Sequence, residues 1–125
     1  MREPRDIPTL CPRFHRASEL IGRRWTGAIL YVLLKTRCRF ATLRAAVPGI
    51  TDRMLSERLQ ELEGQGIVQR TVVPETPVRV EYALTKKGRE LAAAIEAIAG
   101  WAERWIALPD SPARRSAKPR ARRSA

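Results

Sequence analysis

The stretch FATLRAAVPGITDRMLSERLQELEGQG, Phe40–Gly66, decides the fold. We expect a short helix over residues 41–47, a turn at Pro48-Gly49, and a second helix that begins after Thr51. Proline lacks the N–H that a helix interior needs, and glycine accepts turn dihedrals. The Thr51 hydroxyl can cap the second helix, and the negative charge of Asp52 in its first turn suits the helix dipole.

The second helix of this stretch is amphipathic. Leu55, Leu59 and Leu62 follow helical spacing and form one apolar stripe, while Arg53 and Glu57 point away from it. Two short helices joined by a glycine-containing turn are typical of a helix-turn-helix, whose second helix can enter the major groove of DNA. An ordinary helical hairpin with a solvated face has the same local pattern, so the motif alone leaves both interpretations open.

The chain is short and basic. Its 125 residues fit one domain with a modest core. The net charge is +11; six Lys or Arg and one Asp follow Pro109, so this tail carries +5 and residues 1–109 carry +6. A polyanionic partner is therefore expected even without the tail. Since there is no run of about 18 apolar residues and no signal-peptide core, we expect a cytoplasmic protein without a membrane partner.

The polar residues offer no catalytic or metal-binding set. Cys11 and Cys38 are expected to be free thiols in a reducing compartment. Cys11 and His15, spaced i, i+4, are too few ligands for a structural zinc site, so we expect no metal and no cofactor. One histidine and no clustered nucleophile, base and carboxylate argue against an enzyme.

Two helices are expected before the decisive stretch. Apolar spacing predicts a core helix over residues 25–34 and, before it, a helix over residues 13–21 whose apolar face is Phe14, Ala17, Leu20 and Ile21. Lys35, Arg37 and Arg39 then cluster just before the helix-turn-helix. They form either a solvated loop or a phosphate contact; we favour phosphate contact, because such loops often lie beside the DNA backbone.

After the helix-turn-helix the periodicity changes to that of a strand. Residues 67–73 are rich in β-branched side chains and residues 78–84 alternate, which predicts a β-hairpin. A hairpin directly after a helix-turn-helix is the winged-helix arrangement. Arg79, next to the hairpin tip, is expected to contact the DNA backbone. The alternative is a neutral surface arginine paired with Glu81 or Glu75.

A long terminal helix, capped by Thr85 and running over residues 86–108, completes the domain. Its apolar stripe ends with two tryptophans, more apolar surface than a small winged core can cover. We expect the stripe to build a homodimer, because two-fold dimers are the commonest assembly and match palindromic sites. The alternative is packing on the N-terminal helix of the same subunit. The expected interface residues are Leu91, Ile95, Ile98, Trp101, Ala102 and Trp105.

With this order of elements, the sequence resembles the HxlR-type transcriptional regulators, a branch of the winged-helix repressors similar to the MarR group. The likeness spans roughly residues 11–106. Ala41 departs from it, since the family often has a small polar residue there that caps the first helix; that cap is missing or falls to Thr42. The residues that carry the likeness are Cys11-Pro12, Ile21-Gly22, Trp25-Thr26, Arg39-Phe40, Leu43, Val47-Pro48-Gly49-Ile50-Thr51, Met54-Leu55, Arg58-Leu59, Glu61-Leu62, Gly66-Ile67-Val68, Arg70, Pro77, Val80-Glu81-Tyr82-Ala83-Leu84-Thr85 and Gly88.

The resemblance implies an α+β, mostly α, winged helix-turn-helix fold with a long terminal dimerisation helix. It also implies a homodimer that binds double-stranded operator DNA and regulates transcription. With the composition, this divides the chain into an irregular arm (residues 1–10), the DNA-binding and dimerisation domain (residues 11–108) and a disordered basic tail (residues 109–125). The expected DNA-binding residues are Arg39, Arg44, Thr51, Asp52, Arg53, Ser56, Glu57, Arg58 and Arg79, with Arg58 nearer the helix–core boundary.

The resemblance also suggests an effector. Some members of that family sense oxidants or electrophiles through the N-terminal cysteine that matches Cys11, by pairing with its copy in the dimer or by modification. The alternative is a buried, inert thiol that supports helix packing. A small hydrophobic ligand between the terminal helices is a further effector that the sequence leaves open. The competing function is a non-specific nucleic-acid-binding module that uses the basic surface and tail.

Overall fold

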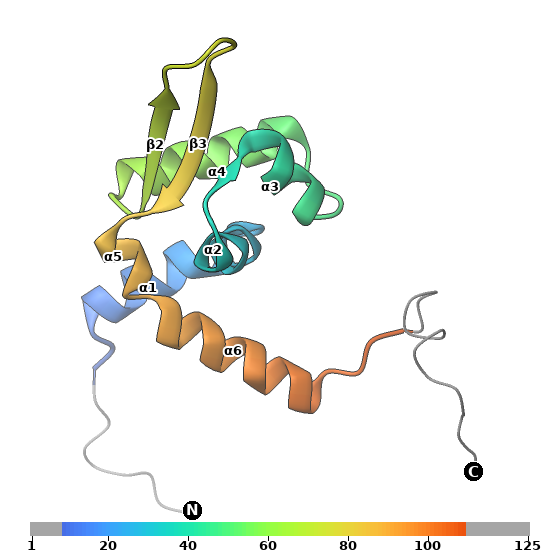
Figure 1. Cartoon of the computed structure of the whole chain (residues 1–125). Helices are drawn as coiled ribbons and strands as arrows, with labels where there is room; N and C mark the ends of the chain where they lie inside the picture. The colour runs from blue at the N-terminus through green and yellow to red at the C-terminus, as the bar shows by residue number, and fades with distance from the viewer. Residues whose placement is uncertain (1–8, 110–125) are drawn as a thin grey trace, which may run out of the picture.

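A computed structural model describes residues 9–109 (Figure 1). The fold is mostly helical with a small antiparallel sheet, as the sequence predicts. Of the expected N-terminal arm, Thr9 and Leu10 are described and lie outside helices and strands; the tail beyond Pro109 lies outside the described residues, and the domain boundary at residue 108 stays a prediction. In chain order, the elements are α1 (Pro12–Gly22), α2 (Thr26–Lys35), β1 (Cys38–Arg39), α3 (Phe40–Ala46), α4 (Asp52–Gly64), β2 (Val68–Val73), β3 (Arg79–Leu84), α5 (Lys86–Arg89) and α6 (Ala92–Trp105).

Helix α2 is the centre of the core, as expected. Ile29 and Leu30 are fully buried and Leu33 nearly so. Helices α1, α3 and α6 and strand β3 all contact α2. The helix begins one residue later than predicted, because Trp25 precedes it as the N-cap in a left-handed conformation with a φ of 79°.

The two helices of the decisive stretch form where the sequence places them. Gly49, in the turn between α3 and α4, has a φ of 92°, which glycine adopts without steric cost. The Thr51 hydroxyl accepts a hydrogen bond from the Met54 N–H at 3.1 Å, so the predicted cap of α4 is confirmed. Helix α3 begins after Arg39 with no side-chain cap, in line with the departure noted at Ala41.

The sheet has the strand order β1–β3–β2. Strands β2 and β3 pair antiparallel along their whole length, so the predicted hairpin is confirmed. Strand β1 was not predicted: the segment before α3 was expected to be a loop, but Cys38 pairs with Tyr82. Two residues are too few to show strand periodicity, and their partner lies far along the chain. This strand ties the start of the helix-turn-helix to the hairpin.

The terminal helix differs from the expectation. Instead of one helix over residues 86–108, the chain forms α5, capped by Thr85, and α6, which ends at Trp105 (Figure 1). At the break, the Leu91 N–H donates to the Gly88 carbonyl at 3.0 Å, one residue short of the α-helical partner. Just before the break, the backbone of α5 at Gly88 lies directly against the Ile67 carbonyl. The chain then turns, and α6 runs along α2.

Helix α1 lies on the surface. It contains no buried residue. Of its expected apolar face, Leu20 and Ile21 are half-buried against the core, whereas Phe14 is 64% exposed. The helix is therefore held mainly at its C-terminal end.

The tight contact at Gly88 generates a stability prediction. In Gly88→Ala the new Cβ collides with the Ile67 carbonyl oxygen and comes within 3.1 Å of Ile67 Cγ2. We expect the free energy of unfolding, measured by urea titration at fixed protein concentration, to fall by about 1–3 kcal/mol. The matched control is Gly64→Ala in α4, where a Cβ meets nothing within 4 Å. That variant should be unchanged or more stable by about 0.5–1 kcal/mol. Equal effects of the two substitutions would contradict the packing argument.

Candidate nucleic-acid interface

Three leucines hold α4 to the core and leave its opposite face in solvent. Leu55, Leu59 and Leu62 are each 2% exposed or less. Because helical residues repeat about every 100°, Arg53 and Glu57 point away from the core. The Arg53 side chain is 87% exposed, and its Nε donates to Glu57 Oε2 at 3.2 Å. A helix presented in this way can place its N-terminal half in a major groove.

An ion pair joins the two helices of the motif. Arg44 Nε, on α3, donates to Asp52 Oδ1, on α4, at 2.6 Å. Both side chains are at least half exposed, so the pair is worth only about 0–1 kcal/mol. It nevertheless orients the Arg44 guanidinium, an expected backbone contact, beside the start of α4. Thr51 is exposed next to it, and Ser56 is half-buried on the flank.

Arg58 lies on the core side of α4 instead of the exposed face. It is 6% exposed, its Nε donates to the Arg24 carbonyl at 2.8 Å, and its Nη1 lies 3.3 Å from Glu61 Oε2. We therefore leave Arg58 out of the proposed DNA contacts. The sequence contained a signal for this placement: Arg58 comes three residues after Leu55 and directly before Leu59, so it lies at the edge of the apolar stripe.

The wing arginine is paired with carboxylates. Arg79 Nη1 lies 3.0 Å from Glu75 Oε1, and Arg79 Nε lies 3.0 Å from Glu81 Oε2. Arg37 Nη1, from the segment before β1, lies 3.5 Å from Glu81 Oε1. This is the alternative that the sequence left open for Arg79. A phosphate contact by Arg79 must therefore compete with two carboxylates.

Two further arginines flank the wing. Arg39 is exposed on β1, opposite Glu81, as its assignment to the DNA-binding set requires. Arg70, which is not among the expected site residues, is exposed on β2. Strand alternation places Arg70 on the same face as the buried Val68, so the pattern did not indicate its exposure. Both arginines are available for backbone contacts.

The apolar stripe of the terminal helix is divided between the core and the surface. Ile95 is buried and Leu91 half-buried against the core of their own subunit. Farther along α6, Ile98, Trp101 and Trp105 are 57%, 52% and 71% exposed. The first half of the stripe therefore packs within its own subunit, on α2, whereas the alternative named the N-terminal helix. The second half is uncovered.

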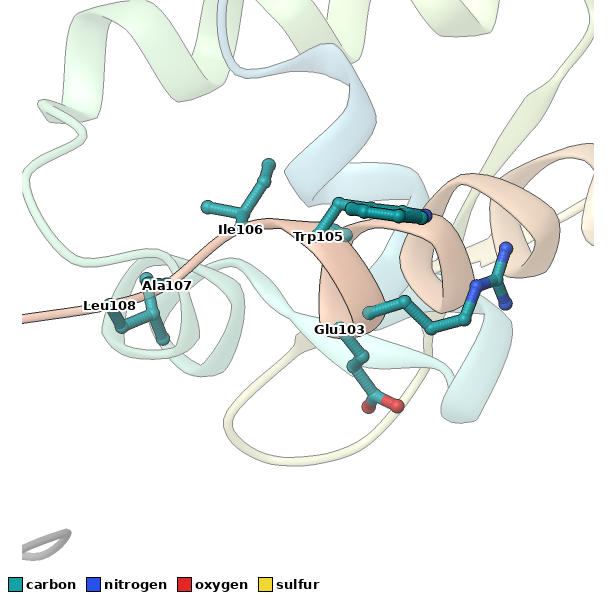
Figure 2. Close-up of a pocket in the computed structure, with 7 residues that line it drawn as sticks. Glu103, Trp105, Ile106, Ala107 and Leu108 are labelled. Carbon is teal, nitrogen blue, oxygen red and sulfur yellow. The ribbon is translucent and has the colours of Figure 1, made fainter.

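The exposed half of the stripe continues past the end of α6. Figure 2 shows the Trp105 ring and the Ile106 side chain above the ribbon, with Glu103 below it. Residues 102–108 line an open hollow at this end of the helix. Ile106 and Leu108 are 52% and 63% exposed, and neither belongs to the expected interface set. Both residues come after the end of α6, where helical spacing no longer predicts exposure. They extend the uncovered apolar surface.

The two cysteines lie in different environments. Cys11 is exposed and is the N-cap residue of α1. Cys38 is buried in β1, and burial raises the pKa of its thiol. A thiol that stays protonated in the core reacts slowly with oxidants, because the thiolate is the reactive form. Cys11 is therefore the accessible thiol of the two.

Other kinds of site receive less support from the described residues. A hollow of about 190 Å³ lies between α1 and the terminal helices. It is lined by Ala17, Leu20, Ile21, Ile67, Lys87 and Leu91. Drug-sized ligands usually occupy about 300–1,000 Å³. Within residues 9–109, no three His, Cys, Asp or Glu side chains lie together as metal ligands. None of the helices in that range has the length and apolarity of a bilayer-spanning helix.

Comparison with known proteins relates this geometry to regulators of transcription. Residues 20–110 match the HxlR-like helix-turn-helix family. The HTH-type transcriptional regulator YvaP of Bacillus subtilis (strain 168) is 48% identical over 97 residues, which cover 78% of this chain and 90% of that protein. The regulator YodB from the same strain is 44% identical over 103 residues, covering 82% and 92%.

Solved structures agree with the sequence comparison. The reduced form of YodB from B. subtilis superposes with a TM-score of 0.70 at 42% identity, covering 82% of this chain and all of that one. The redox regulator HypR in its oxidized form gives a TM-score of 0.74 at 37% identity, covering 78% of this chain and all of that one. YodB has also been crystallised after diamide treatment and with a bound quinone.

The pairing of Arg79 with two carboxylates leads to a prediction about DNA binding. In Glu75→Gln one of the two carboxylates beside Arg79 loses its charge, so the guanidinium can turn to a phosphate. We expect tighter binding to a random duplex and a plot of log Kd against log salt that is steeper by about 0.9, one extra phosphate contact. Glu103→Gln on α6 makes the same charge change far from the wing. A steeper slope in both variants, or in neither, would show that Glu75 does not mask Arg79.

Proposed function

The chain belongs to the HxlR-like helix-turn-helix family of DNA-binding transcriptional regulators, and on this premise we propose that it binds its operator as a homodimer. In this proposal each subunit places one α4 helix in the major groove. The two helices lie about one duplex turn apart, so the operator has two related half-sites. The side chains that face the bases or the nearby DNA backbone are those of Thr51, Asp52, Arg53, Ser56 and Glu57.

The observation that carries the proposal is the presentation of α4. Its leucines are buried, its N-terminus is capped by Thr51, and Arg53 extends into solvent. An arginine held there can form a bidentate contact to guanine, the commonest specific contact in the major groove. Arg39, Arg44 and Arg70 supply charge for the backbone. Such contacts fix the register, whereas the base contacts specify the sequence.

The competing function is a non-specific nucleic-acid-binding module. Recovery of bound fragments from genomic DNA, followed by footprinting, provides the operator for the decisive test. A regulator should prefer that operator over random duplex by about a thousandfold or more at physiological salt. Equal affinity for every duplex, falling steeply with salt, would instead favour the non-specific module.

The uncovered apolar surface of α6 supports the dimer. One continuous segment at the end of the domain carries five exposed large apolar side chains: Ile98, Trp101, Trp105, Ile106 and Leu108. A monomer gains by burying such a patch, and two-fold association of identical patches is the commonest way to do so. We assign the interface to these residues and Ala102, and leave Ile95 to the core of its own subunit.

Cys11 is the residue that we propose for effector sensing. Two thiols lose two hydrogen atoms to an oxidant such as diamide, which becomes the hydrazine, and the sulfurs join as a disulfide. In a homodimer these thiols are Cys11 and Cys11 of the partner subunit. The exposure of Cys11 and the burial of Cys38 support this assignment. We favour an oxidant over a small ligand, because the apolar hollow between α1 and the terminal helices holds only about 190 Å³ and the larger hollow beside α1 is open and lined by Pro12, Arg13, Arg16 and Lys87.

Arg53→Ala tests base reading. We expect the binding free energy for the operator to weaken by about 1–3 kcal/mol, and that for random duplex much less, because a base contact is lost. Competition titration at fixed salt measures both. Arg104→Ala on α6 removes the same charge away from the groove and should leave the operator preference unchanged. A similar loss on operator and random duplex would remove Arg53 from base reading.

Trp105→Glu tests the interface. A charge buried at the centre of an apolar contact opposes association, so the variant should be a monomer at micromolar concentration. Light scattering coupled to size exclusion measures the mass. Glu103→Gln, on the other side of the same helix end, should keep the dimer mass (Figure 2). A Trp105→Glu protein with an unchanged dimer mass would contradict the assignment.

Cys11→Ser tests the sensor. Diamide should change the operator affinity of the wild type and of Cys38→Ala, but not that of Cys11→Ser. Non-reducing gel electrophoresis should show a linked dimer in the first two proteins only. A Cys11→Ser protein that still responds to diamide would remove Cys11 from sensing.

A further inference from the structure

Arg58 is a buried cation that the DNA interface does not use. It is 6% exposed, and arginine is rarely buried to this degree without partners. Its Nε donates to the carbonyl oxygen of Arg24 at 2.8 Å. This hydrogen bond joins the middle of α4 to the turn between α1 and α2, far away in the sequence.

The same turn contacts the helix-turn-helix at a second point. Cη2 of the Trp25 ring lies 3.5 Å from the position of a Cβ on Gly49, in the turn that precedes α4. Trp25 holds a φ of 79°, a conformation that bulky residues rarely adopt. Such strain persists where the surroundings fix the residue. The Trp25 ring against Gly49 is one such contact.

Glu61 adds an ionic contact between the same two segments. Its Oε2 lies 3.0 Å from Arg23 Nη2 and 3.3 Å from Arg58 Nη1. The turn over residues 23–25 is thus attached to the centre of α4 and to the turn before α4. These attachments resist rotation of α4 about its own axis.

We propose that Arg58 is a positioning residue for DNA reading, which sets the direction of the exposed face of α4 through its bond to the Arg24 carbonyl. The proposal rests on the proposed function of the same helix. Arg58 and Arg53 lie on opposite sides of α4, so a rotation that releases one also redirects the other. A bidentate base contact depends on geometry more than a phosphate contact does. Loss of the tie therefore lowers the preference for the operator more than the affinity for DNA in general.

Two substitutions of Arg58 separate the hydrogen bond from the charge. Glutamine carries an amide nitrogen at the same chain position as arginine Nε and can still donate to the Arg24 carbonyl. Methionine has a methyl group at that position and cannot. Both remove the cation and both are good helix formers. Glu61→Gln is the control for charge: the glutamine oxygen can still accept from Arg23 and Arg58, and the bond from Arg58 to the Arg24 carbonyl stays in place.

The readouts are the operator preference and the salt dependence of binding, on full-length protein whose folding is checked by circular dichroism. Arg58→Gln and Glu61→Gln should keep the ratio of operator to random affinity within a few-fold, whereas Arg58→Met should lose roughly tenfold, the effect of one broken base contact. The salt slope should not change. If Arg58 contacts phosphate, both Arg58 variants instead lose about 0.9 in slope, which overturns the proposal. An operator preference as low in folded Arg58→Gln as in Arg58→Met overturns it too.

Hydrogen exchange on the free protein tests the tie without DNA. The Thr26 N–H donates to the Arg23 carbonyl within the tied turn at 3.1 Å. Its exchange should be faster in Arg58→Met than in Arg58→Gln; equal rates would overturn the tie. If Arg58→Met does not fold, Arg58→Gln is compared with the wild type alone. Its salt slope and its Thr26 exchange rate should both equal those of the wild type, and a change in either would overturn the proposal. A wild type without operator preference would contradict the proposed function but not the tie, because the hydrogen-exchange measurement does not involve DNA.

Discussion

The packing of apolar side chains on α2 is the constraint on which the rest of the structure depends. Helices α1, α3 and α6 and strand β3 all meet this helix, whose Ile29 and Leu30 have no exposed surface. Burying each such side chain contributes about 1.5–3 kcal/mol, a large share of the stability of a small domain. Because α3 rests on this core and the α4 leucines join it, the polar face of α4 has a fixed direction. The direction of the exposed face of α4 therefore depends on the core that α4 shares with α2.

Carboxylates beside the expected DNA contacts shape the charge of this surface. Arg53 meets Glu57, Arg44 meets Asp52, and Arg79 lies between Glu75 and Glu81. The pairs of Arg53 and Arg44 are mostly exposed and individually weak, whereas Arg79 and Glu81 are only 28% and 18% exposed. A carboxylate beside an arginine lowers the attraction of that arginine for any polyanion, because the two charges offset each other. A basic chain can in this way bind DNA selectively and not merely coat it.

The terminal stripe serves the subunit fold in its first half and is free for association in its second. Gly88 allows α5 to lie directly on the Ile67 carbonyl, and after the break α6 packs along α2. Ile95 then belongs to the core, whereas Trp101 and Trp105 extend beyond it. A straight helix from residue 86 would present the same residues at other angles. The position of the break therefore affects which part of this continuous apolar pattern the subunit's own core covers.

The sequence by itself determined the elements whose signals are local. The Thr51 cap, the Gly49 turn, the leucine stripe of α4 and the β2–β3 hairpin all follow from spacing within a few residues, and all are confirmed. Only the tertiary structure decided the rest: strand β1, the break after Gly88, the bond from Arg58 to the Arg24 carbonyl, and the choice between the two roles that the sequence left open for Arg79. Periodicity reports which face of an element is apolar. It does not report which distant carbonyl, carboxylate or strand edge meets that face, because these neighbours come together only when the chain folds.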